Sequence, residues 1–155
     1  GGEINPYSFY VGELEELYCN DFEEDDGGFE HRLLSGENQE GADDWMWGSP
    51  MGIGGDPSVA SSGEKIWGND LGGEINGSTY NGEYQNDKHN RLSSPTISVS
   101  GFRKTVLVYD RWLQVEDGFY DQARILNNGE EIWTNHATTQ NIGNEHHQDQ
   151  QPYPL

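Results

Sequence analysis

The apolar residues of this 155-residue chain fall in short runs separated by turns that are rich in glycine and asparagine. Short runs of this kind are typical of β-strands, and no strong stretch repeats apolar residues at helical spacing. The 21 glycines, 5 tryptophans and 8 tyrosines favour tight turns and packed aromatic rings over disorder. We therefore expect an all-β fold, a sandwich of short strands joined by long glycine-rich loops.

The most apolar run, Thr105 to Val115, carries apolar residues on both faces and is predicted to be a central strand covered on two sides. Trp112 and Trp133 are expected in the core between the sheets. The sequence Asn127-Asn128-Gly129 predicts a hairpin, because asparagine and glycine accept positive φ. Other strands are predicted at Asp21–Glu23, within Asp44–Pro50, where Pro50 ends the strand, and at Lys65–Trp67, Leu92–Val99, Ala123–Leu126 and Glu131–Thr134.

The charge of the chain limits its partners. Eight basic and 28 acidic residues give a net charge of −20, which repels phosphate and disfavours nucleic acid and anionic membranes as partners. The sequence has no apolar run near the ~20 residues that a membrane-spanning helix needs, so no membrane insertion is expected. The chain shows no signal peptide and no initiator methionine, and we expect it to be part of a longer protein.

Motifs for catalysis are missing from the sequence. It contains no pair of histidines at zinc-protease spacing, no Gly-x-Ser-x-Gly elbow and no phosphate-binding glycine loop. Cys19 has no basic neighbour that would lower its pKa. We therefore predict that the chain itself is not an enzyme. A zinc hydrolase that uses His136, His146 and His147 is the enzymatic alternative.

Calcium is the predicted cofactor, because Ca²⁺ takes six to eight oxygen ligands from carboxylates, amides and carbonyls. On a strand, Asp21 and Glu23 would leave the same face and offer their oxygens together. Asp70 adds oxygens after the strand at Trp67, and Asp121 lies beside a glycine-containing turn. The predicted metal ligands are thus Glu23, Asp21, Asp70 and Asp121. Solvated carboxylates are the alternative, and we favour it for Asp121.

Five segments, in this order, resemble one family: Cys19–Glu23 (CNDFE), Asp44–Pro50 (DWMWGSP), Ser62–Leu71 (SGEKIWGNDL), Leu92–Ile97 (LSSPTI) and Val108–Trp112 (VYDRW). They are similar to the MAM-like jelly-roll modules of secreted bacterial exoproteins, including immune-inhibitor-A-type metallopeptidases. The resemblance implies a two-sheet jelly roll, an accessory role and a structural calcium near Glu23. It leaves Cys19 free or paired outside the chain, since no second cysteine is present.

The resemblance also sets the expected domain organisation. Residues 1–18 would be a linker or the last strand of a preceding Ig-like domain, residues 19–135 the jelly-roll module, and residues 136–155 a polar tail leading to missing final strands. We expect another domain or chain to complete the sheet beside Thr105 to Val115. The alternative is that Tyr7 to Val11 folds back onto that edge.

The function expected from the sequence is that of a non-catalytic, calcium-stabilised module of a secreted or cell-surface bacterial protein. It would serve adhesion, substrate docking or domain bracing, with a possible glycan or protein ligand. The alternatives are a carbohydrate-binding module, with Tyr80, Tyr84 and Tyr120 on its rim, and an accessory part of a secreted zinc metallopeptidase.

Overall fold

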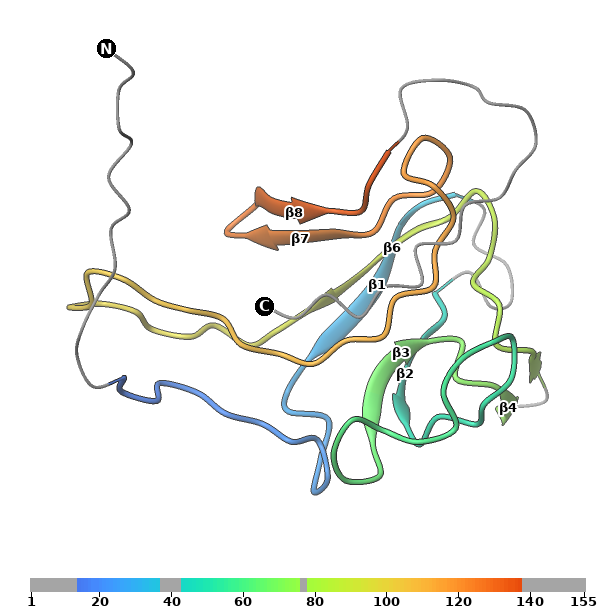
Figure 1. Ribbon diagram of the computed structural model, residues 1–155, viewed down its shortest axis with the longest axis horizontal. Helices are drawn as coiled ribbons and strands as arrows, with labels where there is room; N and C mark the ends of the chain where they lie inside the picture. Colours follow the sequence, from blue (N-terminus) through green and yellow to red (C-terminus); the bar gives the residue numbers. More distant parts are fainter. Residues whose placement is uncertain (1–13, 37–42, 76–77, 138–155) are drawn as a thin grey trace, which may run out of the picture.

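The computed structural model describes residues 14–36, 43–75 and 78–137. Within these ranges the chain forms β-strands and no helix, which confirms the all-β prediction (Figure 1). No membrane-crossing helix is therefore present in the described part of the chain. The strands are β1 (Glu30–Ser35), β2 (Trp45–Gly48), β3 (Ile66–Asn69), β4 (Gly73–Ile75), β5 (Ser78–Tyr80), β6 (His89–Ser93), β7 (Arg124–Asn127) and β8 (Glu130–Thr134).

The described strands pair into four two-stranded antiparallel sheets, β1 with β6, β2 with β3, β4 with β5, and β7 with β8. The β1–β6 and β2–β3 sheets are in contact through β2 and β6. These pairs are shorter than the two continuous sheets of a jelly roll, and that architecture stays a prediction. The boundaries at residues 18 and 135 also stay predictions, and Tyr7 to Gly12 and residues 138–155 lie outside the described ranges.

The β2–β3 sheet confirms two of the predicted strands. Trp47 lies directly opposite Trp67 in the antiparallel register, a cross-strand aromatic pairing of the kind that stabilises sheets. Pro50 follows β2 and has no N–H to continue a ladder. Asp70 ends β3 with a φ of 43°, which turns the chain out of the strand direction.

The predicted hairpin is also confirmed. Asn128 has a φ of 50° and Gly129 a φ of 88°, so both central residues of the turn between β7 and β8 adopt positive φ. This backbone geometry matches the right-handed twist of the two flanking strands.

Three strand predictions are corrected by the structure. Asp21–Glu23 forms a bend, because Phe22 adopts a φ of 62° that no strand allows. The strand predicted at Leu92–Val99 lies earlier, at His89–Ser93, and ends two residues before Pro95. Residues 105–115 form no strand, since they pair with no other strand of the described chain.

The expected covering of residues 105–115 is wrong as well. The side chain of Trp112 is 50% exposed, so it does not lie in the core. Trp133 is half-buried, and the Arg111 guanidinium lies 3.9 Å from its ring centroid. The buried interior of the described chain is small and contains several polar side chains. Its apolar members include Leu71 and Val115, and its polar members are Asp44, Asp70, Asp117 and Asn135.

Candidate functional site

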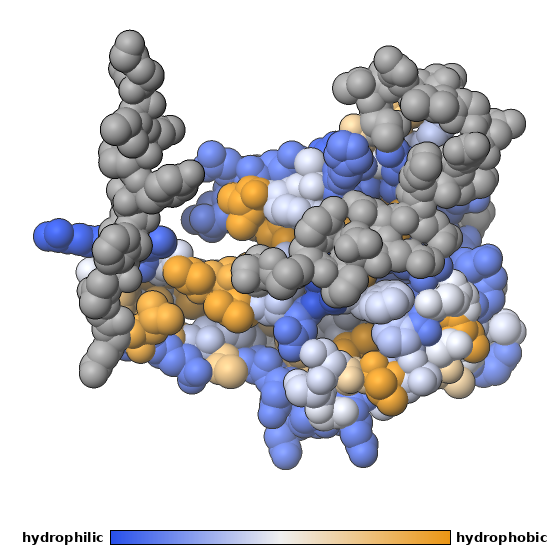
Figure 2. Space-filling view, in the orientation of Figure 1, coloured by the Kyte–Doolittle hydropathy of each residue, from blue (hydrophilic) through white to orange (hydrophobic). Residues whose placement is uncertain are grey.

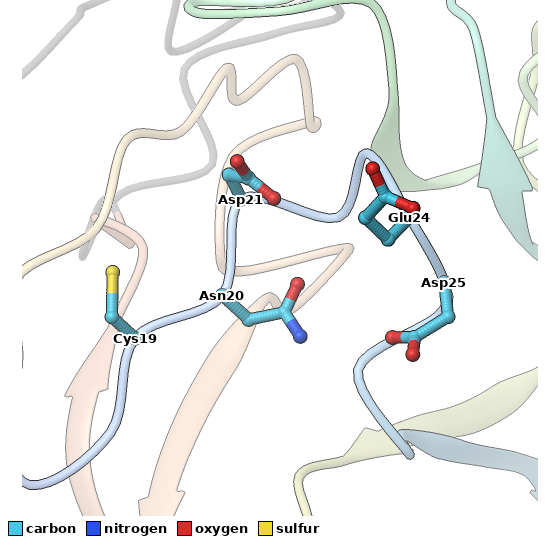
Figure 3. A pocket seen from close by; sticks show the side chains of 5 residues that line it. All are labelled: Cys19, Asn20, Asp21, Glu24 and Asp25. Atoms are coloured by element: carbon cyan, nitrogen blue, oxygen red, sulfur yellow. The ribbon is translucent and has the colours of Figure 1, made fainter.

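The strongest candidate site is the acidic loop, defined here as Asp21 to Asp26. Local hydrogen bonds shape it: Phe22 N donates to Asn20 Oδ1 at 2.6 Å and Glu23 N to Asp21 Oδ1 at 3.2 Å. The loop and the two residues before it line an open hollow of about 320 Å³. Figure 3 shows that the five lining side chains come from one continuous segment, namely Cys19, Asn20, Asp21, Glu24 and Asp25.

Glu23 is not among the residues that line the hollow, and it joins the loop to the segment before β3. Its Oε1 atom accepts hydrogen bonds from the backbone N–H groups of Glu64, at 2.8 Å, and Lys65, at 3.0 Å. Lys65 Nζ donates in turn to the carbonyl of Glu23 at 2.8 Å. A side chain at Gly63 would overlap Glu23 Oε1, and the φ of 65° at Gly63 also favours glycine.

Two tryptophans of the β2–β3 sheet hold the carbonyls of the acidic loop. Trp47 Nε1 donates to the carbonyl of Phe22, and Trp67 Nε1 donates to that of Asp26, both at 2.9 Å. The ammonium of Lys65 lies 4.4 Å from the centroid of the Trp47 ring. These contacts join the segments Cys19–Glu23, Asp44–Pro50 and Ser62–Leu71 into one local structure. The acidic loop is therefore positioned by tertiary contacts as well as by its own turns.

Two aspartates with 1% exposure, Asp44 and Asp70, lie at one end of this sheet, directly before β2 and directly after β3. Asp44 Oδ1 accepts from Asn69 Nδ2 at 2.8 Å and from Asn90 Nδ2 at 2.6 Å, which joins β3 and β6 to the start of β2. Asp70 N donates to the carbonyl of Asp44 at 2.8 Å. Burial raises the pKa of Asp44, and the amide hydrogen bonds oppose that rise.

Asp70 connects two glycine-containing turns. Its Oδ1 atom accepts from Gly72 N at 3.1 Å and from Gly82 N at 3.0 Å. The negative charge of Asp70 lies close enough to Asp56 to affect the pKa of Asp56. Burial, and then the negative charge of Asp70, raises the pKa of Asp56.

Asp121 takes part in a third hydrogen-bond network. Its Oδ2 atom accepts from the Tyr84 hydroxyl at 2.7 Å, and the same hydroxyl accepts from Glu116 N at 3.2 Å. Burial, together with this bond to a carboxylate, raises the pKa of Tyr84 to about 12. Asn135 Nδ2 donates to the carbonyls of Glu116, at 3.1 Å, and Asp121, at 3.0 Å. The end of β8 is thereby attached to the turn at residues 116–121.

The four predicted metal ligands thus lie in three different hydrogen-bond networks. Asp21 and Glu23 share the acidic loop, whereas Asp70 and Asp121 belong to separate networks. The described residues contain no group of three or more His, Cys, Asp or Glu side chains arranged to hold a metal ion. The calcium site stays a prediction. Of the histidines considered for zinc, His146 and His147 lie outside the described ranges. Cys19 is exposed and free.

Two residues that organise these networks, Asp44 and Asn135, are not among the predicted site residues. Asp44 directly precedes the alternating run Trp45-Met46-Trp47, and a carboxylate at the start of such a run is a usable sequence signal for a structural hydrogen-bond acceptor. Asn135 offers no comparable signal, because its partners, at positions 116, 121 and 123, are brought to it only by the fold.

Comparison with known proteins found one similarity, to a segment of a bacterial peptidase. Over 117 residues the chain is 32% identical to Bacillopeptidase F of Bacillus subtilis (strain 168). The match covers 75% of this chain but only 7% of that much longer protein. No family model and no solved structure matches the chain. The chain is therefore similar to a small segment of a peptidase, and the similarity does not extend to the rest of that protein.

Proposed function

We propose that this chain is a non-catalytic accessory module of a secreted bacterial peptidase, in which it braces neighbouring domains or docks protein substrates. The observation that carries the proposal is the 32% identity to a segment amounting to 7% of Bacillopeptidase F. A segment that small, within a protein whose name denotes peptidase activity, leaves ample chain elsewhere for the catalytic domain. The absence of catalytic motifs from the sequence supports the same assignment.

The architecture also supports an accessory role. Three carboxylates of the described residues make structural hydrogen bonds: Glu23 joins two loops, Asp44 joins three strands, and Asp121 fixes a tyrosine. A nucleophile paired with a base, or two carboxylates in contrasting environments, would be needed for hydrolysis. The many structural carboxylates instead suit a module that holds its shape in an extracellular medium.

A chimera tests the proposal. The matching 117-residue segment of Bacillopeptidase F is replaced by the corresponding residues of this chain, and released peptidase activity is measured after secretion from the host. We expect the chimera to keep most of the activity and a deletion of the segment to lose much of it. A chimera carrying Asp44→Ala should resemble the deletion, because this change leaves the Asn69 and Asn90 amides without their buried acceptor.

Two results would contradict the proposal. In the first, the deletion secretes and cleaves as well as the parent, which would leave the segment without an accessory role. In the second, the purified chain on its own hydrolyses a denatured protein substrate, and the hydrolysis persists in a preparation that shows no contaminating peptidase.

Carbohydrate binding is the second candidate, favoured by one observation. Phe119 and Tyr120 are both exposed, and their rings form an edge-to-face pair with centroids 5.0 Å apart. Exposed aromatic rings can stack on sugars, as tryptophan and tyrosine do at wet interfaces. Tyr84, another of the predicted rim residues, is held by its two hydrogen bonds. A glycan array decides: binding that is lost in Tyr120→Ala supports this candidate, and a silent array rejects it.

A further inference from the structure

Residues 94–113 form an arm that extends away from the described strands and turns back at its tip. In Figure 1 the arm, coloured yellow to orange, reaches one end of the longest axis of the molecule. Phe102 N donates to the carbonyl of Val99 at 3.2 Å, and this bond closes the turn at the tip. Gly101 lies in the turn with a φ of 92°, and a Cβ added there would meet no atom of the described residues within 4 Å. The tip of the arm is therefore open to solvent at Gly101.

A basic pair, Arg103-Lys104, directly follows this turn, and both residues are exposed. The three most exposed apolar side chains of the arm come next, namely Val106, Leu107 and Val108, at 59%, 60% and 77%. Figure 2 shows a hydrophilic projection beside apolar surface at the end of the molecule that the arm reaches in Figure 1. The basic pair is therefore accessible to another protein.

The backbone that follows the basic pair belongs to no ladder. Across residues 14–36, 43–75 and 78–137, no backbone hydrogen bond involves an N–H or C=O group of residues 105–109. An endopeptidase binds its substrate as an extended strand, through backbone groups that must be free to bond to the enzyme. Exposed loop tips are for this reason the preferred sites of nicking. Residues 105–109 meet this requirement while the chain is folded.

Three other basic residues show that exposure alone does not create such a site. Arg32, Arg91 and Arg124 lie in β1, β6 and β7, and Arg32 pairs with Arg91 in the antiparallel register. Arg32 and Arg124 are exposed like the basic pair, but their backbone groups take part in ladders. Cleavage beside these residues requires local opening of a strand pair first.

The remaining three basic residues lie beside segments that are held in place. The backbone N–H and the ammonium of Lys65 both donate hydrogen bonds to Glu23. The guanidinium of Arg111 lies 3.9 Å from the centroid of the Trp133 ring. Lys88 directly precedes β6. Of the eight basic residues, the basic pair therefore has the most accessible backbone on its carboxyl side.

The arm also differs in charge from the rest of the chain. Three basic residues and one acidic residue give residues 94–113 a net charge of +2, whereas the whole chain carries −20. An enzyme with a negatively charged specificity pocket is repelled by most of this molecule and attracted to the arm.

We infer that the basic pair is the site at which an endopeptidase specific for basic residues cleaves the folded chain. Enzymes of this class hold the lysine or arginine side chain of their substrate with a carboxylate, as trypsin does. Water is the co-reactant. For cleavage after Lys104, the bond between its carbonyl carbon and the nitrogen of Thr105 breaks, the carbon gains the hydroxyl of water and the nitrogen gains the proton. At neutral pH the new ends are a carboxylate on Lys104 and an ammonium on Thr105.

The cleaved chain stays together as a two-chain form. The described pairs β1–β6, β2–β3 and β4–β5 all precede the basic pair, and β7–β8 follows it, so the cut divides no described sheet. Hydrogen bonds also connect the two sides of the cut: they join Ser61 to Asp110, Gly54 to Gln114, and Tyr84 to both Asp121 and Glu116. The two fragments therefore keep their own strand pairs and the bonds between them.

Limited digestion of the full chain with trypsin tests the inference, with the fragments followed by mass spectrometry. We expect the first cut at the basic pair, about tenfold or more faster than any cut at Arg32, Arg91 or Arg124, because those sites are cleaved only from a transiently opened state. On size-exclusion chromatography the two fragments should elute together in buffer and separate in urea. Digestion of the urea-unfolded chain should lose the tenfold preference, since all eight basic residues are then equally accessible.

Two variants complete the experiment. Arg103→Gln combined with Lys104→Gln removes the basic pair and should abolish the first cut, whereas the matched control Arg32→Gln, also at an exposed arginine, should leave it unchanged. Tryptophan fluorescence reports in each variant whether the β2–β3 sheet remains folded.

Three results would overturn the inference. The first is a first cut at a strand residue of the folded chain. The second is an equal preference for the basic pair in the urea-unfolded chain, which would assign the preference to the sequence alone. The third is separation of the two fragments in buffer, which would exclude a two-chain form.

Discussion

At the scale of single residues, Glu23 shows how one side chain connects segments that are distant in the sequence. It lies 41 residues before Glu64, and its carboxylate accepts a hydrogen bond from the backbone N–H of that residue. Its backbone carbonyl accepts a hydrogen bond from the ammonium group of Lys65. Hydrogen bonds to a charged group contribute about 1.5–3 kcal/mol each when they are well formed, less when they are exposed to water.

The first prediction compares two substitutions of Glu23. Glu23→Ala removes the acceptor for two backbone N–H groups and should lower the free energy of unfolding by about 2 kcal/mol. Glu23→Gln keeps an oxygen that can accept both bonds and should cost less than half as much. Urea unfolding of the three proteins, followed by tryptophan fluorescence, measures both values. Equal costs for alanine and glutamine would show that the two hydrogen bonds contribute nothing.

The second prediction concerns the like-charged pair Asp56 and Asp70. Since the folded pKa of Asp56 is raised, its ionised form destabilises the folded state at neutral pH. This penalty is complete above the folded pKa, declines as the pH falls through that value, and disappears below the ordinary value of 3.8. Asp56→Asn should therefore stabilise the protein at pH 7.

The pH dependence of this stabilisation checks its cause. Melting temperatures of Asp56→Asn and the unmodified chain should converge as the pH approaches the ordinary value of 3.8 for aspartate. Asp25→Asn serves as the control, because the carboxylate that it removes is exposed. A stabilisation of Asp56→Asn that stays constant from pH 7 to pH 3.5 would exclude relief of charge as its origin.

At the scale of the secondary-structure elements, the β7–β8 hairpin depends on its turn. Gly129 has a φ of 88°, and a Cβ added there would meet no atom within 4 Å. The third prediction is that Gly129→Ala destabilises the protein by about 1 kcal/mol, entirely through backbone strain. Asn128→Gly should change stability little, because glycine accepts the same φ. Chemical denaturation measures both variants, and an unchanged Gly129→Ala would mean that the turn rearranges freely.

Strands were predicted correctly where residues close together in the sequence determine them, and wrongly where contacts between distant residues do. The Asn128-Gly129 turn and the Trp45, Trp47 alternation are local signals, and both gave the strands observed. Thr105 to Val115 has the strongest strand composition, yet a strand also needs a partner for its backbone groups, and composition cannot supply one. Phe22 adopts a φ of 62°, and its carbonyl accepts a hydrogen bond from Trp47 Nε1. The alternation Asp21-Phe22-Glu23 had predicted a strand there instead.

The candidate site was predictable only in part for the same reason. Glu23 was singled out in the sequence as a metal ligand, and that role stays a prediction. The sequence did not indicate its hydrogen bonds to backbone N–H groups of a loop 41 and 42 residues away. Burial of Asp44 depends on Asn69 and Asn90 arriving from two other strands. Pairings over such distances leave no periodic pattern in the sequence.

At the scale of the whole molecule, calcium remains the predicted stabilising ion. An ion that binds only the folded state adds about 2.7 kcal/mol at a hundredfold excess over its Kd. The fourth prediction is that melting in calcium exceeds melting in chelator by several degrees, and that Asp21→Ala together with Glu23→Gln removes the difference. Glu23→Gln keeps the bonds to Glu64 and Lys65, so a loss there reports on the charge. Identical melting curves for the unmodified chain would reject a calcium site.

The long sequence separation between hydrogen-bonded residues also affects how fast the chain folds. Asn90 bonds to Asp44 across 46 residues, and Gln114 Nε2 donates to the carbonyl of Gly54 across 60. Each such contact stabilises the chain only after a long loop has closed, and closing the loop costs conformational entropy. Proteins dominated by contacts of this kind fold in milliseconds to seconds. A newly synthesised chain therefore spends that interval with its valines and tryptophans open to neighbouring chains, and its 28 acidic residues, which make such chains repel one another, protect it from aggregation while it folds.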